Sequence, residues 1–124
     1  MPRILNLQGT YDYDPERAMV FDIDGTILDG ASYQDGYINA KPIPDAIELL
    51  GWLRDDGWFI VLYTGRSEPY RNITEEQLVR FEVPYDLLVM GKPPAVAYVD
   101  DQAVSAEIGI RLMRLSLQEE HSRL

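Results

Sequence analysis

The sequence contains no cysteine and only one histidine among its 124 residues. Without cysteine the chain cannot form disulfides, thiolate zinc sites or a cysteine nucleophile. The lack of disulfides also fits a reducing compartment such as the cytoplasm.

Long apolar runs and an excess of basic side chains are missing as well. No stretch reaches the roughly 20 apolar residues that a transmembrane helix needs. The first 15 residues, MPRILNLQGTYDYDP, lack the apolar region of a signal peptide. Asp and Glu number 21 against 11 Lys and Arg, a formal net charge of −10, which disfavours a broad nucleic-acid-binding surface. We therefore expect a soluble, cytoplasmic protein without a membrane partner.

The length and composition predict one compact domain. The chain has 46% hydrophobic residues and shows no internal repeat, low-complexity tract or linker. We expect a single domain over residues 1–124, with a core at 19–117 and residues 1–18 as an N-terminal extension of unknown role.

Short apolar runs alternate with helix-like segments. Pro44 suits the first turn of one helix and Gly57 its end, while Thr74 and Gln77 have the spacing of a capping box at the start of another. Alternating strands and helices predict an α/β fold with a mainly parallel sheet. The expected strands cover 17–23, 58–63, 86–90 and 96–99, and the expected helices 43–57 and 74–81.

The C-terminal part is harder to interpret from its pattern. Residues 103–107 resemble a short helix that Gly109 would close. Residues 110–117 then alternate apolar and polar side chains, which favours a final strand, although a helix is also compatible.

Distinctive polar side chains follow each expected strand. In a parallel sheet, ligands bind outside the carboxyl ends of the strands, so these side chains should gather at one edge. They are Asp22 and Asp24, Thr64 and Arg66, Lys92, and Asp100 with Asp101.

Such a set of side chains indicates a particular chemistry. Several carboxylates at one site repel one another unless a cation is present. Oxygen ligands without cysteine or histidine favour a hard ion such as Mg²⁺. A lysine and a hydroxyl beside them would contact an anion, and the combination indicates phosphoryl transfer.

The stretch DIDGT at 22–26 resembles the D-x-D-G-T signature of the haloacid dehalogenase-like phosphatase superfamily. Thr64, Lys92 and the Asp100–Asp101 pair are similar to its second, third and fourth motifs, and the resemblance covers residues 19–109. The stretch from VPYDLLVMGKP to YVDD is similar to small cap-less members known as capsule-biosynthesis phosphatases. The phosphatase domain of polynucleotide kinase-phosphatase enzymes is a more distant match. The resemblance implies a three-layer Rossmann-like α/β domain without a large cap.

The resemblance also implies roles for the first-motif residues. Asp22 would be the nucleophile that forms an aspartyl-phosphate. Asp24 would act as the general acid and base, and its backbone carbonyl would bind the metal. Because side chains two apart on a strand point to the same side, both carboxylates can serve one site, helped by a turn at Gly25.

The other motifs complete the implied site. Asp101 would bind Mg²⁺ directly together with Asp22, and Asp100 would support it, although the order of these two is open. Thr64 would hydrogen-bond a phosphoryl oxygen, and Lys92 would offset the negative charge on Asp22 and on the phosphate. Gly65 and Arg66 are also candidates for phosphate or substrate binding, and a surface ion pair is the alternative for Arg66.

The resulting hypothesis is a Mg²⁺-dependent phosphomonoesterase with an open site. Its substrate would be a small phosphorylated molecule, such as a sugar phosphate or a nucleotide. A polynucleotide 3′-phosphatase is an alternative, disfavoured by the net charge and by Gln102, where related members often carry arginine. A catalytically weak metal- or phosphate-binding module acting through a partner is another. The open site is also compatible with closure by a partner subunit in a homo-oligomer. Tyr33 and Tyr37 in the segment after the first motif are expected to pack rather than to touch substrate.

Overall fold

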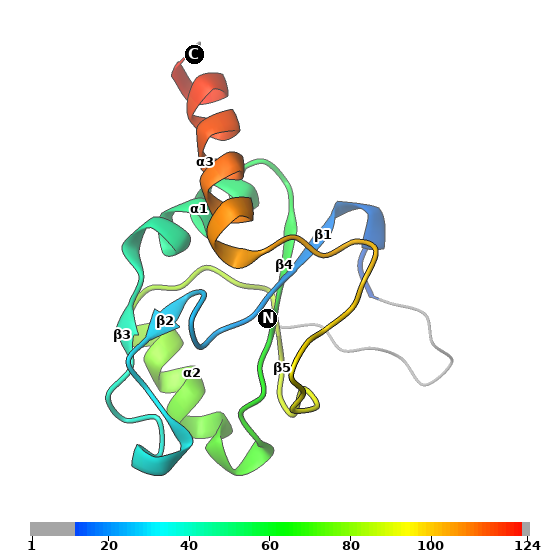
Figure 1. Cartoon of the computed structure of the whole chain (residues 1–124). Helices are drawn as coiled ribbons and strands as arrows, with labels where there is room; N and C mark the ends of the chain where they lie inside the picture. Colours follow the sequence, from blue (N-terminus) through cyan, green and yellow to red (C-terminus); the bar gives the residue numbers. More distant parts are fainter. Residues whose placement is uncertain (1–11, 123–124) are drawn as a thin grey trace.

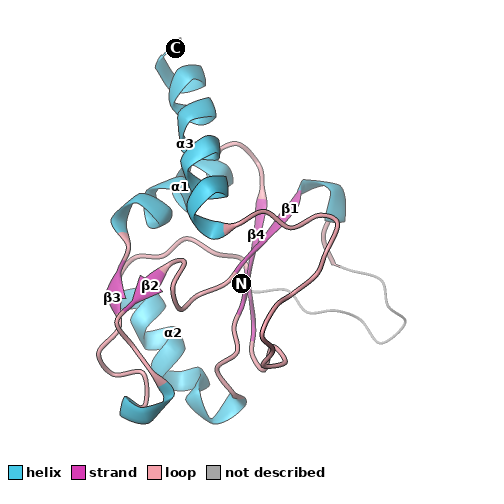
Figure 2. Ribbon diagram, in the orientation of Figure 1, coloured by secondary structure: helices cyan, strands magenta, loops and turns pink. Residues whose placement is uncertain are grey.

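The computed structural model describes residues 12–122, which form an α/β domain (Figures 1 and 2). The part of the N-terminal extension before residue 12 lies outside the described residues. The strands are β1 (Ala18–Phe21), β2 (Leu28–Asp29), β3 (Lys41–Pro42), β4 (Phe59–Tyr63) and β5 (Leu87–Val89). The α-helices are α1 (Pro44–Asp55), α2 (Arg71–Arg80) and α3 (Ala106–Ser122), and short 3₁₀ helices cover Pro15–Arg17, Tyr33–Asp35 and Glu68–Tyr70.

Three parallel strands form the central sheet in the order β1-β4-β5. Val20 on β1 pairs with Val61 on β4, which pairs in turn with Leu87 on β5. α1 connects β1 to β4 and α2 connects β4 to β5, as parallel neighbours require. This arrangement confirms the expected α/β class with a mainly parallel central sheet.

All three helices contribute to one hydrophobic core. α1 buries Leu49 and Leu50, while α2 contributes Leu78 and α3 contributes Leu117. These side chains meet the sheet at residues such as Leu62, which is fully buried. Within residues 12–122, no helix combines the length and the apolar composition needed to cross a bilayer.

The segment between β1 and α1 forms a small flap. β2 and β3 pair antiparallel at its base, and residues 30–40 form its tip. Asp35 organises this tip, because its carboxylate accepts hydrogen bonds from the backbone N–H groups of Ser32 and Tyr37 and from the Asn39 side chain. The Ser32 hydrogen bond is the largest of the effects that lower the pKa of Asp35.

The prediction of a capping box at Thr74 was wrong. α2 begins at Arg71, because the 3₁₀ turn at Glu68–Tyr70 leads directly into it. Thr74 and Gln77 therefore lie inside the helix, where both side chains are buried.

The prediction of a strand at 96–99 was also wrong. Residues 91–105 form no helix or strand, and the side chains of Val96 and Val99 are fully exposed. Pro93 and Pro94 lack the N–H groups that a strand ladder needs. The Tyr98 hydroxyl also donates to the Pro93 carbonyl at 2.5 Å, which turns the segment back on itself.

Residues 110–117 belong to α3 and not to a strand. Gly109 does not end a helix, because its N–H donates to the Ser105 carbonyl at 2.8 Å and the helix continues. Ile110, Met113 and Leu117 face the core at helical spacing, a second periodicity that the alternating pattern obscured.

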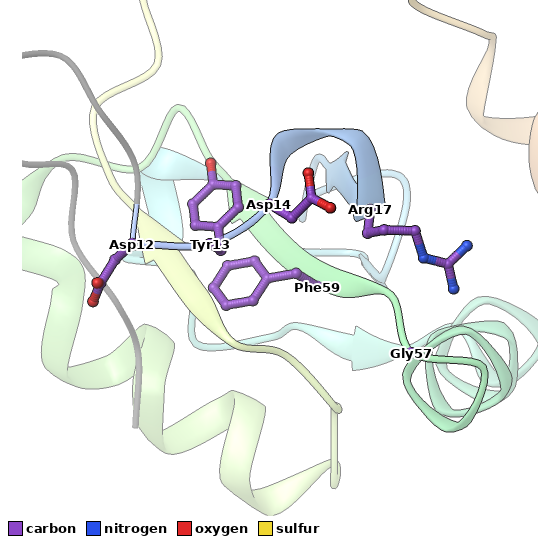
Figure 3. Close-up of a pocket in the computed structure, with 6 residues that line it drawn as sticks. All are labelled: Asp12, Tyr13, Asp14, Arg17, Gly57 and Phe59. Carbon is purple, nitrogen blue, oxygen red and sulfur yellow. The ribbon is translucent and has the colours of Figure 1, made fainter.

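A hollow of about 250 Å³ lies at the amino ends of β1 and β4 (Figure 3). The rings of Tyr13 and Phe59 stack there with centroids 4.2 Å apart. Arg17 donates to the Asp56 carbonyl at 2.6 Å and lies over the Trp58 ring. This hollow is at the opposite end of the strands from the predicted site.

Replacing Leu117 by alanine should lower the free energy of unfolding by about 2 to 4 kcal/mol, because a buried leucine is removed from the core. Urea denaturation measures the loss. Leu112→Ala on the same helix is the matched control, since Leu112 is 61% exposed and Leu117 is 8% exposed. Equal losses in the two variants would contradict the packing of α3.

Candidate functional site

A cavity of about 350 Å³ lies at the carboxyl ends of the parallel strands. Three of its walls come from the segments that follow β1, β4 and β5, and the flap adds a fourth. The lining residues are Asp22, Asp24, Ala31, Tyr37, Gly65, Arg66, Lys92 and Tyr98. Five of the eight predicted site residues are therefore gathered around one cavity.

A tight turn after β1 presents Asp22 and Asp24 to this cavity. Ile23 between them is fully buried in the core. Its carbonyl accepts the backbone N–H groups of residues 26–28, which folds the chain back at once. Gly25 adopts a φ of +86°, a left-handed conformation that glycine reaches without strain.

Backbone hydrogen bonds join the loops that follow β4 and β5. The Thr64 N–H donates to the Val89 carbonyl at 3.0 Å, and the Lys92 N–H donates to the Thr64 carbonyl at 2.8 Å. The Gly91 N–H reaches the Arg66 carbonyl at 2.8 Å. Strand pairing thus continues past the strand ends and fixes Thr64 and Lys92 side by side.

Lys92 forms an ion pair with Asp22. Its Nζ donates to Asp22 Oδ1 at 3.0 Å, and both side chains keep some exposure to the cavity. The ammonium group also lies 4.9 Å from the ring centroid of Tyr98. A positive charge is therefore held beside Asp22, the predicted nucleophile.

Arg66 is only 1% exposed, and it donates two hydrogen bonds to Asp24. Its Nη2 donates to Asp24 Oδ1 at 2.8 Å and its Nε to Oδ2 at 2.9 Å. The remaining terminal nitrogen, Nη1, donates to Thr74 Oγ1 at 3.0 Å and Gln77 Oε1 at 2.7 Å. The alternative of a surface ion pair for Arg66 is thereby wrong.

Tyr37 covers the guanidinium of Arg66 from the flap, with its ring centroid 4.4 Å away. Burial, and then the negative charge of Asp24, raise the pKa of the Tyr37 hydroxyl. Its backbone has a φ of +65°, a rare conformation for a residue with a side chain. The Tyr37 carbonyl accepts from Gln77 Nε2 at 2.5 Å, so the flap and α2 are joined at the same place.

Sequence reasoning missed Thr74, Gln77 and Tyr98 as parts of this site. Thr74 and Gln77 precede Leu78 on the buried face of α2, and two polar groups on a buried helix face need a polar partner. This pattern could have indicated that Thr74 and Gln77 face a buried polar group, but their spacing was interpreted as a capping box. No comparable signal marked Tyr98, because it fell inside a segment expected to be a strand.

The side chain of Thr64 is fully buried and does not line the cavity. Its Oγ1 accepts the backbone N–H of Arg66 at 3.1 Å, so it shapes the turn that carries the arginine. Its contact with a phosphoryl oxygen stays a prediction.

Asp100 and Asp101 are exposed and do not line the cavity. Asp100 Oδ1 accepts the N–H of Gln102 at 2.9 Å, which forms a local turn. Among residues 12–122, no three Asp, Glu or His side chains are grouped as a metal site would need. Metal binding by this pair stays a prediction.

The oxygen atoms at the cavity nevertheless suit a hard cation. Mg²⁺ keeps several waters and is commonly held by one or two carboxylates together with substrate phosphate oxygens. Asp22 has one oxygen that is not bonded to Lys92, whereas both oxygens of Asp24 bond to Arg66. Asp22 is thus the side chain in the cavity best able to bind such an ion.

Replacing Gln77 by leucine should lower the free energy of unfolding by about 1 to 3 kcal/mol, because a buried Arg66 donor loses its acceptor. Chemical denaturation measures this loss. Glu76→Leu, at an exposed position of the same helix, is the control and should change stability much less. A neutral Gln77 variant would contradict the described network around Arg66.

No protein-family model matches the chain, and no curated protein sequence matches it. Chains in solved structures are, however, similar to it. A crystal structure of an MCSG target from Vibrio cholerae is 25% identical with a TM-score of 0.62, over 84% of this chain and 98% of that chain.

Two structures of the Pnkp1/Rnl/Hen1 complex, one described as an RNA repair complex, also contain similar chains. They are 22% and 25% identical, both with a TM-score of 0.54, over 85% and 78% of this chain. This chain spans only about a third of each, 33% and 35% of their lengths. The comparisons show that this chain shares its fold with these proteins.

Proposed function

We propose that this protein is a phosphomonoester hydrolase whose reaction takes place in the cavity at the carboxyl ends of β1, β4 and β5. The observation that carries the proposal is the pair of aspartates on one turn, each held by its own cation. Asp22 is bound by Lys92 and Asp24 by Arg66. This arrangement agrees with the resemblance of DIDGT to the haloacid dehalogenase-like phosphatases.

The reaction proceeds in two displacements at phosphorus. A carboxylate oxygen of Asp22 attacks the phosphorus atom, and the bond to the leaving oxygen breaks as Asp24, which enters the cycle protonated, gives that oxygen its proton. A water molecule then attacks the aspartyl-phosphate and gives its proton to Asp24. Inorganic phosphate leaves, and both aspartates return to their starting states.

Lys92 has two tasks in this scheme. An anionic carboxylate and an anionic phosphate repel each other, and a positive charge beside both reduces the repulsion. The 3.0 Å contact with Asp22 places the ammonium group where it also aims the nucleophile.

Arg66 positions Asp24 and does not reach the phosphate in this scheme. Two hydrogen bonds fix both oxygens of the Asp24 carboxylate, and α2 fixes the other end of the guanidinium. The acid–base group is therefore held in one orientation before substrate arrives, which lowers the entropic cost of the proton transfers.

Mg²⁺ is the proposed cofactor. Asp22 and the backbone carbonyl of Asp24 would hold it, with Asp101, supported by Asp100, as the further predicted ligand. The ion would neutralise part of the phosphate charge when bound.

The similarity to part of an RNA repair complex, together with the alternative that the sequence left open, motivates a second candidate, a phosphatase acting on the 3′ end of a nucleic acid. The net charge of −10 argues against extensive binding of a nucleic acid backbone. The cation in the cavity with some exposure, Lys92, is already paired with Asp22. A small phosphorylated substrate is therefore the better proposal.

Asp22→Asn should abolish turnover of an aryl phosphate, because the amide is a far weaker nucleophile than the carboxylate. A phosphate-release assay measures this. Asp55→Asn at the exposed end of α1 removes one negative charge far from the chemistry and should leave turnover intact. Full activity of Asp22→Asn would overturn the proposed nucleophile, and a wild-type protein inactive on a broad phosphate panel would favour a non-catalytic binding module.

Removal of divalent ions with EDTA should abolish activity, and added Mg²⁺ should restore it. Calorimetric titration with Mg²⁺ gives a readout independent of turnover: binding should weaken in Asp22→Asn and persist in Asp55→Asn. Undiminished activity in EDTA would contradict the proposed cofactor.

A further inference from the structure

Tyr98 lies on the cavity wall beside Lys92 but has no part in the proposed chemistry. Its side chain is 54% exposed, and its hydroxyl is anchored by the hydrogen bond to the Pro93 carbonyl. This anchor restrains the ring, so that a ligand entering the cavity meets a preformed aromatic surface. An amphipathic ring with few rotatable bonds loses little conformational entropy when it binds a partner.

The other aromatic ring on the cavity wall, that of Tyr37, is packed between two neighbours. Tyr37 packs against the Arg66 guanidinium at 4.4 Å and against Tyr70 with ring centroids 5.1 Å apart. Tyr33, on the same flap, is 70% exposed but does not line the cavity. Tyr98 is therefore the lining ring with the larger accessible surface.

The chemistry of the remaining wall narrows the choice of leaving group. The four charged lining residues form two mutual ion pairs, at the end of the cavity where the phosphate would lie. The rest of the described lining consists of Ala31, Gly65 and the two tyrosines. Ala31 and Gly65 offer no side-chain hydrogen bond to the hydroxyl groups of a sugar, whereas the exposed ring of Tyr98 offers a surface on which a flat ring can stack.

We propose that Tyr98 is a specificity residue that stacks on a planar ring of the leaving group. The preferred substrates are then phosphomonoesters whose leaving group carries an aromatic ring, such as aryl phosphates and nucleoside monophosphates, in preference to sugar phosphates. The proposal rests on the proposed phosphatase function and adds its substrate class. The 4.9 Å separation between Lys92 Nζ and the Tyr98 ring keeps the ring near a phosphate held at Asp22.

The test compares kcat/KM for adenosine monophosphates, phenyl phosphate and glucose 6-phosphate. Wild-type protein should prefer the two aromatic classes, and comparing adenosine with phenyl esters shows whether a nucleobase or any ring suffices. Tyr98→Ala should lower kcat/KM for the aromatic esters about 10- to 100-fold, mainly through KM, because stacking on a base is lost. Its effect on glucose 6-phosphate should be much smaller.

Three further variants separate stacking from loop structure. Tyr98→Phe keeps the ring but loses the hydroxyl anchor, and should retain most of the preference. Tyr98→Leu keeps apolar bulk without a ring, and should behave like Tyr98→Ala. Tyr33→Ala removes an exposed tyrosine that does not line the cavity, and should keep the wild-type preference.

A binding arm separates failure of this inference from failure of the phosphatase proposal. Adenosine monophosphate and inorganic phosphate are titrated into the Asp22→Asn protein with and without Tyr98→Ala. Weaker binding of the nucleotide alone supports the stacking role, even if the wild-type protein hydrolyses nothing. Equal losses for all esters and for phosphate in Tyr98→Ala, or a wild-type preference for glucose 6-phosphate, would overturn it.

Discussion

The charge of Arg66 is the constraint on which the arrangement of the site depends. A buried guanidinium is strongly destabilising unless its donors are matched by acceptors and its charge by a carboxylate. Here the carboxylate is Asp24, and the further acceptors are Thr74 and Gln77 on α2. With Tyr37 over the guanidinium, the turn after β1, the loop after β4, the helix and the flap meet at one cation.

This arrangement makes the stability of the domain and the geometry of the site interdependent. Gln77 accepts from Arg66 and donates to the Tyr37 carbonyl, so one side chain fixes both the arginine and the flap. Lys92 is the less buried cation, at 16% side-chain exposure against 0% for Arg66. The division suits the proposed chemistry: the buried cation aims an acid–base group, and the accessible one can meet an anionic substrate.

Much of the sheet and the edge that carries the candidate site could be predicted from the sequence, because local patterns carried that information. The apolar runs of β1, β4 and β5 are short, continuous and punctuated by polar turns, and parallel topology brings their carboxyl ends together. The proximity of Asp22 and Lys92 followed from this reasoning. The ion pair between Asp24 and Arg66 was not predicted, because the helix residues that hold the rest of the guanidinium, Thr74 and Gln77, had been interpreted as a capping box.

The incorrect predictions for the C-terminal part of the chain also have specific causes. Residues 110–117 satisfy two periodicities, and packing of Leu117 on the core favours the helix. The 96–99 segment has strand-like composition, but consecutive prolines and the Tyr98–Pro93 hydrogen bond give it another conformation. Asp100 and Asp101 were expected at the site on the strength of that strand, and without it they lie outside the cavity wall.

The central claim is that Asp22 carries the phosphoryl group during turnover. Rapid acid quenching during hydrolysis of an aryl phosphate, followed by borohydride reduction, converts an aspartyl-phosphate to homoserine that peptide mass spectrometry can locate. The account predicts homoserine at position 22 in the wild-type protein, and none when substrate is omitted. Steady turnover without modification at position 22, or modification at another aspartate, would contradict it.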